Sequence, residues 1–276
     1  MKLLLGASFL AVCGTALAAD AGFECLIEPW QVVEIRVPAD GIIATIGASR
    51  GDTVRRGQVL VELQSSAERS AVESARYRSR MEGQISSARN RIDYATKKLE
   101  RLVDLMRDNY TSAQSRDEAE AEKRLAEAEL QSALEARELA TIELQRAQEQ
   151  LALRTVPAPF SGVVVDRMLN PGDLAESGNG RRPVLKVAQT DPMRADVALP
   201  AALFGKVRVG ARASLVAAVG GARFAATVRS VDKLIDAASG TFVARLEVPN
   251  GQALVPGGSR CSATIDGLVP PARLQP

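Results

Sequence analysis

Between about Ala67 and Leu151, apolar residues recur in alternating steps of three and four, and charged residues fill most positions between them. This 3.5-residue period is typical of a coiled-coil seam on an otherwise solvated helix. The segment has no proline and one glycine, Gly83, and it is rich in strong helix formers. The seam positions are Met81, Ile85, Ala88, Ile92, Ala95, Leu99, Leu102 and Met106 in the first half, and Ala126, Leu130, Ala133, Ala140, Leu144, Ala147 and Leu151 in the second.

A polar break, Asp108–Ser112, divides this segment and ends in residues that make good helix N-caps. The pattern predicts an antiparallel helical hairpin over residues 66–153. Arms of about 40 residues would each be about 60 Å long at ~1.5 Å per residue. A coiled coil used only for dimerisation would have the same pattern, so the hairpin alone does not define a function.

On both sides of the hairpin the pattern changes to short alternating strands separated by turns. One sequence motif occurs twice. It consists of a proline, a glycine three residues after the proline, an apolar pair directly after this glycine, and a Gly-Asp pair that begins ten residues after the same glycine. The repeat predicts two halves of one small β-sandwich, residues 31–65 and 154–190, which meet where the helices enter and leave. Its glycines favour tight turns and positive backbone angles. They are Gly41, Gly51 and Gly57 in the first half, and Gly162 and Gly172 in the second.

The segment from Asp191 onward alternates apolar-rich runs with Pro, Gly and Asn turns, which predicts a β-barrel domain over residues 191–267. A closed barrel would leave few free strand edges. Residues 268–276 are expected to form a loose tail. The predicted strands are Ala195–Leu199, Ala213–Val216, Phe224–Val231, Thr241–Val248 and Ser259–Ile265.

Residues 1–19 have the features of a signal peptide: a positive start, an apolar run and small residues before a cleavage point after Ala18 or Ala19. The protein is therefore expected to be exported. Two alternatives remain open, lipidation at Cys13 and an uncleaved anchor. No later segment is apolar enough to cross a bilayer.

The composition excludes several chemistries. Histidine is absent, which removes the commonest general base and the commonest metal ligand. A net charge of +2 gives no indication of nucleic-acid binding. Cys25 and Cys261 would remain after signal cleavage, either as a disulfide or as two separate thiols. A disulfide would close a loop of more than 200 residues, worth about 4–5 kcal/mol in the chain-entropy model.

Two lipoyl-like half-motifs interrupted by a helical hairpin resemble the HlyD-type periplasmic adaptors, or membrane fusion proteins, among them adaptors of RND transporters. The phrase Pro-Phe-Ser-Gly-Val-Val at 159–164 and the turn from Gly51-Asp52 to Gly57 carry the resemblance. It implies an α+β multidomain fold: a long antiparallel coiled-coil hairpin inserted between two halves of a lipoyl-like β-sandwich (a barrel-sandwich hybrid), followed by a β-barrel. Lipoyl and biotinyl carriers have a modified lysine where this chain has Gln64-Ser65-Ser66, so no cofactor is expected.

Family members that dock onto outer-membrane channels carry an Arg, a Leu four residues later and a Ser seven residues after the Leu. Arg101, Leu105 and Ser112 have this spacing. The resemblance therefore implies that these three residues dock onto a channel. Arg101 and Leu105 fall on one helical face, one turn apart. Because Arg and Leu are common in any coiled coil, the spacing alone leaves their role open.

The resemblance implies a non-catalytic adaptor that links an inner-membrane transporter, of the RND or ABC type, to an outer-membrane channel. It also implies a homo-oligomer, expected to be a hexameric ring, in the periplasm. The alternatives are an adaptor of an ABC-type or type I secretion exporter and a dimerisation protein without a channel partner. Too few residues precede Gln31 or follow Ile265 for the membrane-proximal domain expected of many RND adaptors. The transporter contact therefore stays open at this point: either the barrel alone makes it, or the inner-membrane partner belongs to another class.

Overall fold

The computed structural model describes residues 22–178, 181–218, 220–252 and 255–269. The described chain forms two compact units. The barrel unit contains residues 22–33, Phe160–Val163 and 187–269, and the hairpin unit contains Glu34–Pro159 and Val164–Lys186. The predicted signal peptide, Cys13 included, lies outside the described residues, as does most of the predicted tail.

The barrel unit contains a closed antiparallel barrel with the strand order β1-β10-β13-β12-β11-β14. The five predicted strands are confirmed. The range predicted for the barrel, 191–267, is nevertheless incomplete, because it leaves out β1 (Phe23–Pro29) at the other end of the chain. The other strands are β10 (Met193–Pro200), β11 (Arg212–Ala217), β12 (Arg223–Val231), β13 (Thr241–Val248) and β14 (Ser259–Ile265), with a short 3-10 turn, η1 (Ala201–Leu203), after β10.

Alternate residues of these strands point into the barrel and fill it with large side chains. In β1, Phe23, Cys25 and Ile27 are buried and the residues between them are exposed. Fully burying a large apolar side chain contributes about 1.5–3 kcal/mol, so this core is the main source of the barrel's stability. Its most deeply buried large residues are Ile27, Met193, Leu199, Leu215, Phe242, Leu246 and Ile265.

The first and last strands of the barrel are joined covalently. Cys25 and Cys261 are opposed across the β1–β14 pair, with their Cα atoms 4.8 Å apart, and the structure joins them as a disulfide. Their separation in sequence is 236 residues. The bond therefore ties the beginning of the described chain to its end.

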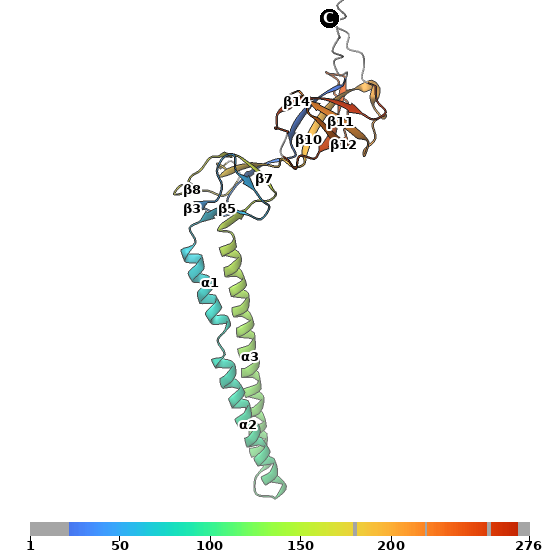
Figure 1. Ribbon diagram of the computed structural model, residues 1–276. Helices are drawn as coiled ribbons and strands as arrows, with labels where there is room; N and C mark the ends of the chain where they lie inside the picture. Colours follow the sequence, from blue (N-terminus) through green and yellow to red (C-terminus); the bar gives the residue numbers. More distant parts are fainter. Residues whose placement is uncertain (1–21, 179–180, 219, 253–254, 270–276) are drawn as a thin grey trace, which may run out of the picture. The chain divides into compact units, whose positions relative to one another are not determined.

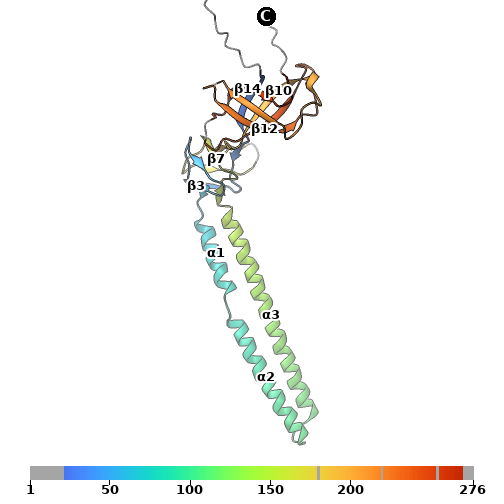
Figure 2. The same ribbon diagram turned by 45° about the vertical axis from the view of Figure 1, so that its right-hand side comes forward.

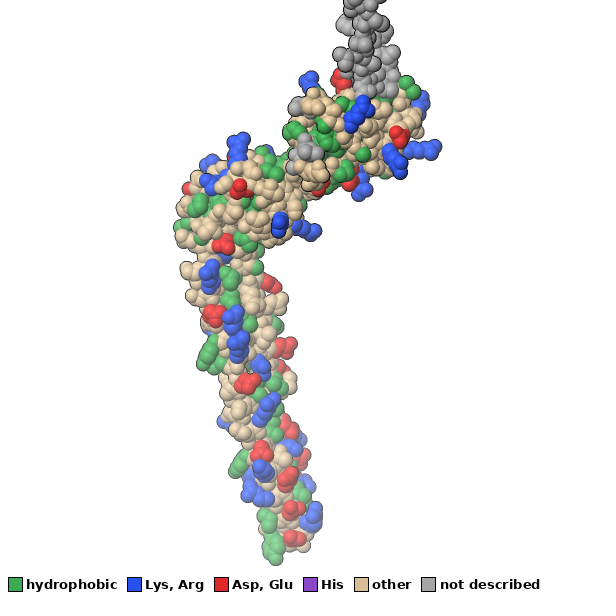
Figure 3. Space-filling view, viewed as in Figure 1, with side chains coloured by type: hydrophobic (Ala, Val, Ile, Leu, Met, Phe, Trp, Pro, Cys, Tyr) green, Lys and Arg blue, Asp and Glu red, His purple; other side chains and the backbone are tan. Residues whose placement is uncertain are grey.

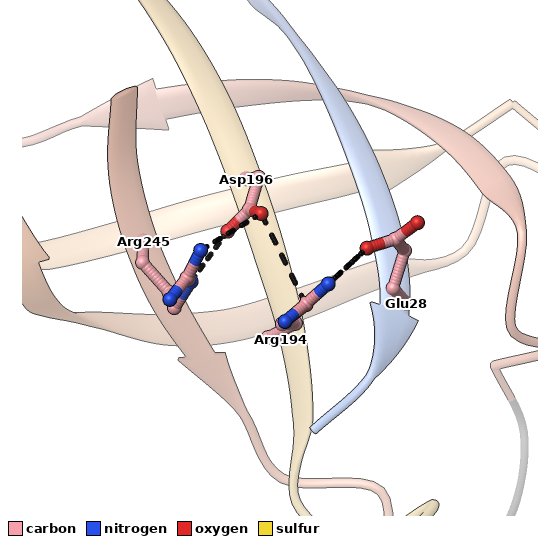
Figure 4. A network of polar contacts seen from close by, with 4 residues as sticks. All are labelled: Glu28, Arg194, Asp196 and Arg245. Atoms are coloured by element: carbon pink, nitrogen blue, oxygen red, sulfur yellow. Dashed lines mark hydrogen bonds and ion pairs between the residues drawn. The ribbon is translucent and has the colours of Figure 1, made fainter. Parts of the chain in front are cut away.

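A ladder of ion pairs crosses three neighbouring strands of the barrel (Figure 4). On β10, Arg194 Nη2 lies 2.5 Å from Glu28 Oε2 of β1, and Arg194 Nε lies 3.9 Å from Asp196 Oδ2. Arg245 Nε of β13 donates to Asp196 Oδ1 at 2.8 Å. That hydrogen bond raises the pKa of Arg245 above its usual range. Because exposed pairs contribute little individually, we regard the ladder as fixing strand register more than adding stability.

The sandwich consists of two four-stranded sheets, and each contains two strands from each predicted half. The prediction of two halves forming one sandwich is therefore confirmed. In the hairpin unit, the N–H of Gly57 donates to Ala158 O at 2.9 Å, and the N–H of Ala158 donates to Gln58 O at 2.8 Å. The sheets are β6 (Thr155–Pro157), β5 (Val59–Leu63), β3 (Gly41–Ile46) and β8 (Leu174–Ala175), and β2 (Val32–Ile35), β9 (Leu185–Ala188), β7 (Gly162–Arg167) and β4 (Thr53–Val54).

The five repeat glycines serve two purposes. Gly51, Gly57 and Gly172 have φ angles of 91°, 82° and 94°, which only glycine adopts readily. Gly41 and Gly162 do not have positive φ, and close packing explains them instead. A Cβ atom at Gly162 would lie 2.1 Å from the carbonyl oxygen of Ala188.

The hairpin consists of α1 (Ser66–Ser79) and α2 (Gly83–Arg107) in its first arm and α3 (Ala113–Ala152) in its second. Figures 1 and 2 both show α1 and α2 following one another along α3. The antiparallel hairpin is confirmed, and its first arm is divided into two helices. Among the described residues, no helix is long and apolar enough to pass through a membrane.

The break between α1 and α2 has its origin in the apolar pattern. Val72 and Ala75 of α1 pack against α3, and Ile85 is the first buried residue of α2. Val72 and Ile85 are separated by about three and a half turns at 3.6 residues a turn, so one continuous helix would place them on nearly opposite faces. The break lets both stripes face α3. Met81, predicted as a seam residue, lies inside the break and is 57% exposed.

Candidate functional site at the tip of the hairpin

The loop at the tip has a defined backbone conformation. Asn109 has a φ of 59°, the N–H of Tyr110 donates to Leu105 O at 2.9 Å, and the N–H of Asn109 donates to Met106 O at 3.1 Å. These two hydrogen bonds and the left-handed residue form a Schellman motif, which satisfies carbonyls at the end of α2. The polar break predicted at 108–112 is therefore a short, ordered turn.

Ser112 caps the second arm. Its Oγ accepts a hydrogen bond from the N–H of Ser115 at 3.3 Å, and the two hydroxyl groups lie 3.0 Å apart. The side chain is at the surface. Ser112 thus fixes where α3 begins, whether or not it also contacts a partner.

Arg101 and Leu105 lie one turn apart on α2, both exposed. Arg101 Nε donates to the backbone oxygen of Lys97 at 3.2 Å. In the described part of the chain, no carboxylate forms an ion pair with this guanidinium. Leu105 exposes 45% of its surface. The structure therefore presents a guanidinium with unused donors beside an exposed leucine, close to the tip.

Tyr110 is a surface residue that the sequence analysis did not single out. It is 81% exposed at the turn, among the most exposed large apolar side chains of the described chain. Its place in a polar loop was visible in the sequence, but its exposure follows from the Schellman motif, which turns the chain immediately before it. An exposed aromatic residue at a tip is a frequent anchor in protein interfaces.

The base of the hairpin is held by Arg154, which follows α3. Its Nε and Nη2 donate to Glu68 Oε1 of α1 at 3.0 and 2.6 Å, and its Nη1 donates to Asp40 O at 2.7 Å. Gly41 leaves room for this guanidinium, since a Cβ there would lie 2.9 Å from Nη1. Asp40 in turn accepts hydrogen bonds from the N–H and Oγ of Ser177 at 2.6 and 2.7 Å. We call these four residues, Asp40, Glu68, Arg154 and Ser177, the base clamp.

Both carboxyl groups of the base clamp are stabilised in their charged form. The backbone N–H and the hydroxyl of Ser177 lower the pKa of Asp40. The pKa of Glu68 is lowered mainly by its own backbone N–H, with a smaller contribution from Arg154. The base clamp is therefore a charged network that joins both helical arms to both halves of the sandwich.

A lipoyl-like sandwich interrupted by a helical hairpin, with an accompanying β-barrel, defines the membrane fusion class of adaptor folds. The chain belongs to the family described as CzcB-like, barrel-sandwich hybrid domain, whose model matches residues 31–180. A second model, the CusB-like beta-barrel domain, matches residues 195–264. The resemblance to membrane fusion adaptors is thus confirmed.

Several curated proteins are similar over most of this chain. Multidrug export protein AcrE of Escherichia coli K12 is 26% identical over 261 residues, which cover 90% of this chain and 64% of the relative. Multidrug resistance protein MdtE of the same organism is 25% identical over 251 residues, covering 86% of this chain and 62% of the relative. An uncharacterised protein of Haemophilus influenzae is 27% identical over 216 residues, covering 78% and 49%. The chain thus spans from about half to under two thirds of these relatives' lengths.

Solved structures show the same fold. MacA from Actinobacillus actinomycetemcomitans superposes with a TM-score of 0.74 at 21% identity, over 88% of this chain and 77% of that one. The membrane fusion protein Spr0693 from Streptococcus pneumoniae R6 gives a TM-score of 0.63 at 18% identity, over 89% and 98%. These likenesses support the fold alone.

Proposed function

We propose that this protein is a non-catalytic adaptor subunit of a tripartite efflux system in the periplasm. It would link an inner-membrane transporter to an outer-membrane channel, and the hairpin tip would dock onto the channel. The observation that carries the proposal is the exposed pair Arg101 and Leu105 near the ordered turn of a hairpin that interrupts a barrel-sandwich hybrid. Relatives named for multidrug resistance and export support an efflux role.

The tip offers three kinds of contact to a channel. The free Nη donors of Arg101 suit backbone carbonyls at the end of a partner helix. Leu105 suits a shallow apolar groove, and the exposed Tyr110 ring suits a pocket beside it. Ser112 would contribute its hydroxyl while it caps α3. Such a surface is small, so the tip would bind weakly on its own and gain affinity when several copies act together.

We also propose that several copies surround a central conduit, with a hexameric ring as the expected arrangement, and that the barrel contacts the transporter. The transporter would belong to the RND or the ABC class. There are two alternatives. The protein would serve a type I secretion exporter, or it would be a coiled-coil dimerisation protein without a channel partner.

The test is export in cells that carry Arg101→Ala or Leu105→Asp, together with co-purification of the outer-membrane channel. Each variant should reduce channel recovery by about tenfold or more, as expected for loss of an interface anchor. Matched controls are Arg89→Ala, an exposed arginine of α2, and Leu134→Asp, a leucine of α3 that is 40% exposed. Both controls should leave export and recovery unchanged.

Circular dichroism should show the same helix content in all four variants, since the substituted side chains lie at the surface. Normal export and channel recovery with both tip variants would refute the docking proposal. Equal loss in the tip variants and the controls would show that the effect does not come from docking.

A further inference from the structure

One end of the barrel holds the start of the described chain and two loops. β1 begins there, directly after Gly22, and β14 ends there at Ile265. Because β1 is antiparallel to β10, β10 ends at the same place, where Pro200 lies opposite Thr241 of β13. The turn η1 after β10 and the loop between β12 and β13 are therefore neighbours at this end. We call it the entry end of the barrel, and we call residues 232–240 the Leu234 loop.

The entry end exposes large apolar side chains. Leu234 and Val269 are 83% and 84% exposed, which makes them the two most exposed large hydrophobic residues of the described chain. Ile235, next to Leu234, is also exposed. Phe204, after η1, packs edge-on against the buried ring of Phe242 and still exposes part of its own ring. A group of exposed apolar side chains usually marks a surface that binds a partner or a membrane.

Hydrogen bonds give the Leu234 loop a defined conformation. The N–H of Asp236 donates to Thr241 O at 2.8 Å, and the N–H of Gly240 donates to Asp236 O at 2.8 Å. Asp236 Oδ1 accepts the N–H groups of residues 238 and 239 at 2.8 and 3.2 Å. The N–H of Ala201 in η1 donates to Gly240 O at 2.9 Å, which joins the two loops. The apolar side chains are thus presented on an ordered hairpin.

Two lysines accompany these apolar residues. Lys206 and Lys233 are exposed, and each lies within two residues of an exposed apolar side chain. Within the part of the chain that the structure describes, neither ammonium group forms an ion pair. The Leu234 loop also contains Asp232 and Asp236, so the entry end is not strongly cationic. Apolar contact would therefore supply most of the affinity for a partner, and the lysines would add attraction to anionic groups.

The place where the chain enters the barrel favours a bilayer as the partner. The apolar run of residues 3–18 is expected to engage the inner membrane during export, and Gly22 follows it closely in sequence. The chain therefore reaches the barrel from the membrane at the entry end. At the opposite end of the barrel, Pro29 ends β1 and Met193 begins β10, and the sandwich and hairpin lie between these two residues in the sequence.

We propose that the entry end binds directly to the surface of a phospholipid bilayer. Leu234 and Ile235 enter the boundary between headgroups and acyl chains, where their apolar surface leaves water. The stems of Lys206 and Lys233 lie along the lipid while their ammonium groups contact phosphates. A contact of this size is weak and reversible in one copy and gains strength when several copies bind together. The proposal is independent of docking at the hairpin tip, and it leaves the outer faces of the barrel strands available to a transporter.

Vesicle flotation with the protein purified after export tests this contact, with the N-terminus defined by intact mass. The vesicles contain phosphatidylethanolamine and phosphatidylglycerol. Leu234→Asp should lower vesicle binding at least about tenfold, because a charge replaces the inserted apolar side chain. The matched control is Leu139→Asp, which changes an exposed leucine of α3 and should bind like the parent. Lys206→Glu combined with Lys233→Glu should weaken binding to these vesicles more than binding to phosphatidylcholine vesicles.

Tryptophan fluorescence gives a second measurement, which does not depend on whether the signal segment is retained. The native chain has a single tryptophan, Trp30, which follows β1 at the opposite end of the barrel. In the variant Leu234→Trp, the emission should shift to shorter wavelength on vesicles and be quenched by lipids with brominated acyl chains. The emission of the parent should not change.

Three results would overturn the proposal. The first is an unchanged emission of Leu234→Trp on vesicles that demonstrably carry the protein. The second is equal vesicle binding by Leu234→Asp and Leu139→Asp when intact mass shows that the signal segment has been removed. The third is a loss of transporter co-purification by Leu234→Asp with vesicle binding unchanged, which would assign the entry end to the transporter.

Discussion

The barrel and the hairpin are stabilised in different ways. In the barrel, leucines such as Leu199, Leu215 and Leu246 have no exposed surface. In the hairpin, most of the buried residues of α2 and α3 are alanines. On the face drawn in Figure 3, Lys, Arg, Asp and Glu side chains lie along the hairpin with hydrophobic side chains exposed among them. The strands of the barrel thus keep most of their large apolar residues inside, whereas the hairpin leaves several available to partners.

The largest difference in stability between the barrel and the hairpin should appear when the disulfide between Cys25 and Cys261 is reduced. Its loss is expected to lower the free energy of unfolding of the barrel by up to about 4–5 kcal/mol, because a long loop in the unfolded chain is released. Urea unfolding with and without dithiothreitol, followed by the fluorescence of the single tryptophan, Trp30, measures this. The free energy of unfolding of a double Cys25→Ala/Cys261→Ala variant should be the same with and without dithiothreitol. Two titratable thiols in the unreduced, unfolded parent would contradict the bond.

The second largest difference in stability between the barrel and the hairpin should appear when single leucines are replaced by alanine. Leu246→Ala should cost the barrel about 3 kcal/mol, within the usual range for a buried leucine. Leu99→Ala in the half-buried seam of α2 should cost about 1 kcal/mol, since less apolar area is lost. Leu134→Ala, at the surface, should change stability by less than about 0.5 kcal/mol. Urea unfolding followed by circular dichroism compares the three, and equal losses in barrel and seam would contradict the comparison.

The smallest expected effect is the acid sensitivity of the base clamp. Asp40 and Glu68 have folded pKa values below their ordinary values of 3.8 and 4.5. The unfolded chain therefore takes up protons first as pH falls, so their stabilisation is complete above about pH 4.5 and is lost progressively below it. Helix content measured by circular dichroism against pH should fall only slightly less steeply in this range for Arg154→Ala, because this guanidinium makes the smaller contribution to the lowered pKa of Glu68. Arg146→Ala, an exposed arginine of α3, should behave like the parent.

Much of the fold could be predicted from the sequence because the apolar patterns of its strands and helices are local. Thr241–Val248 and Ser259–Ile265 alternate strictly, and the structure begins and ends both strands at the predicted residues. The strand at Phe23–Pro29 alternates equally well, but its partners lie at the far end of the chain, and sequence gives no measure of such pairing. The helix break at 80–82 was missed because each stripe looks regular by itself. Only the common partner α3 reveals that the stripes of α1 and α2 are out of phase.

For the candidate site, too, the sequence shows the local pattern but not the contacts between distant elements. The spacing of Arg101, Leu105 and Ser112 was visible in the sequence, and so was the capping ability of Ser112. Which side chains remain exposed was not, because exposure depends on the rotation of α2 against α3. Tyr110 was therefore overlooked, although it is more than half exposed.

Hydrogen–deuterium exchange of the protein with and without the outer-membrane channel tests the central claim most directly. We predict that amides from Arg101 to Ser115 gain protection in the complex while the barrel strands exchange at unchanged rates. Protection of the barrel alone, or unchanged exchange at the tip in a complex that demonstrably forms, would contradict the assignment of the tip as the docking surface.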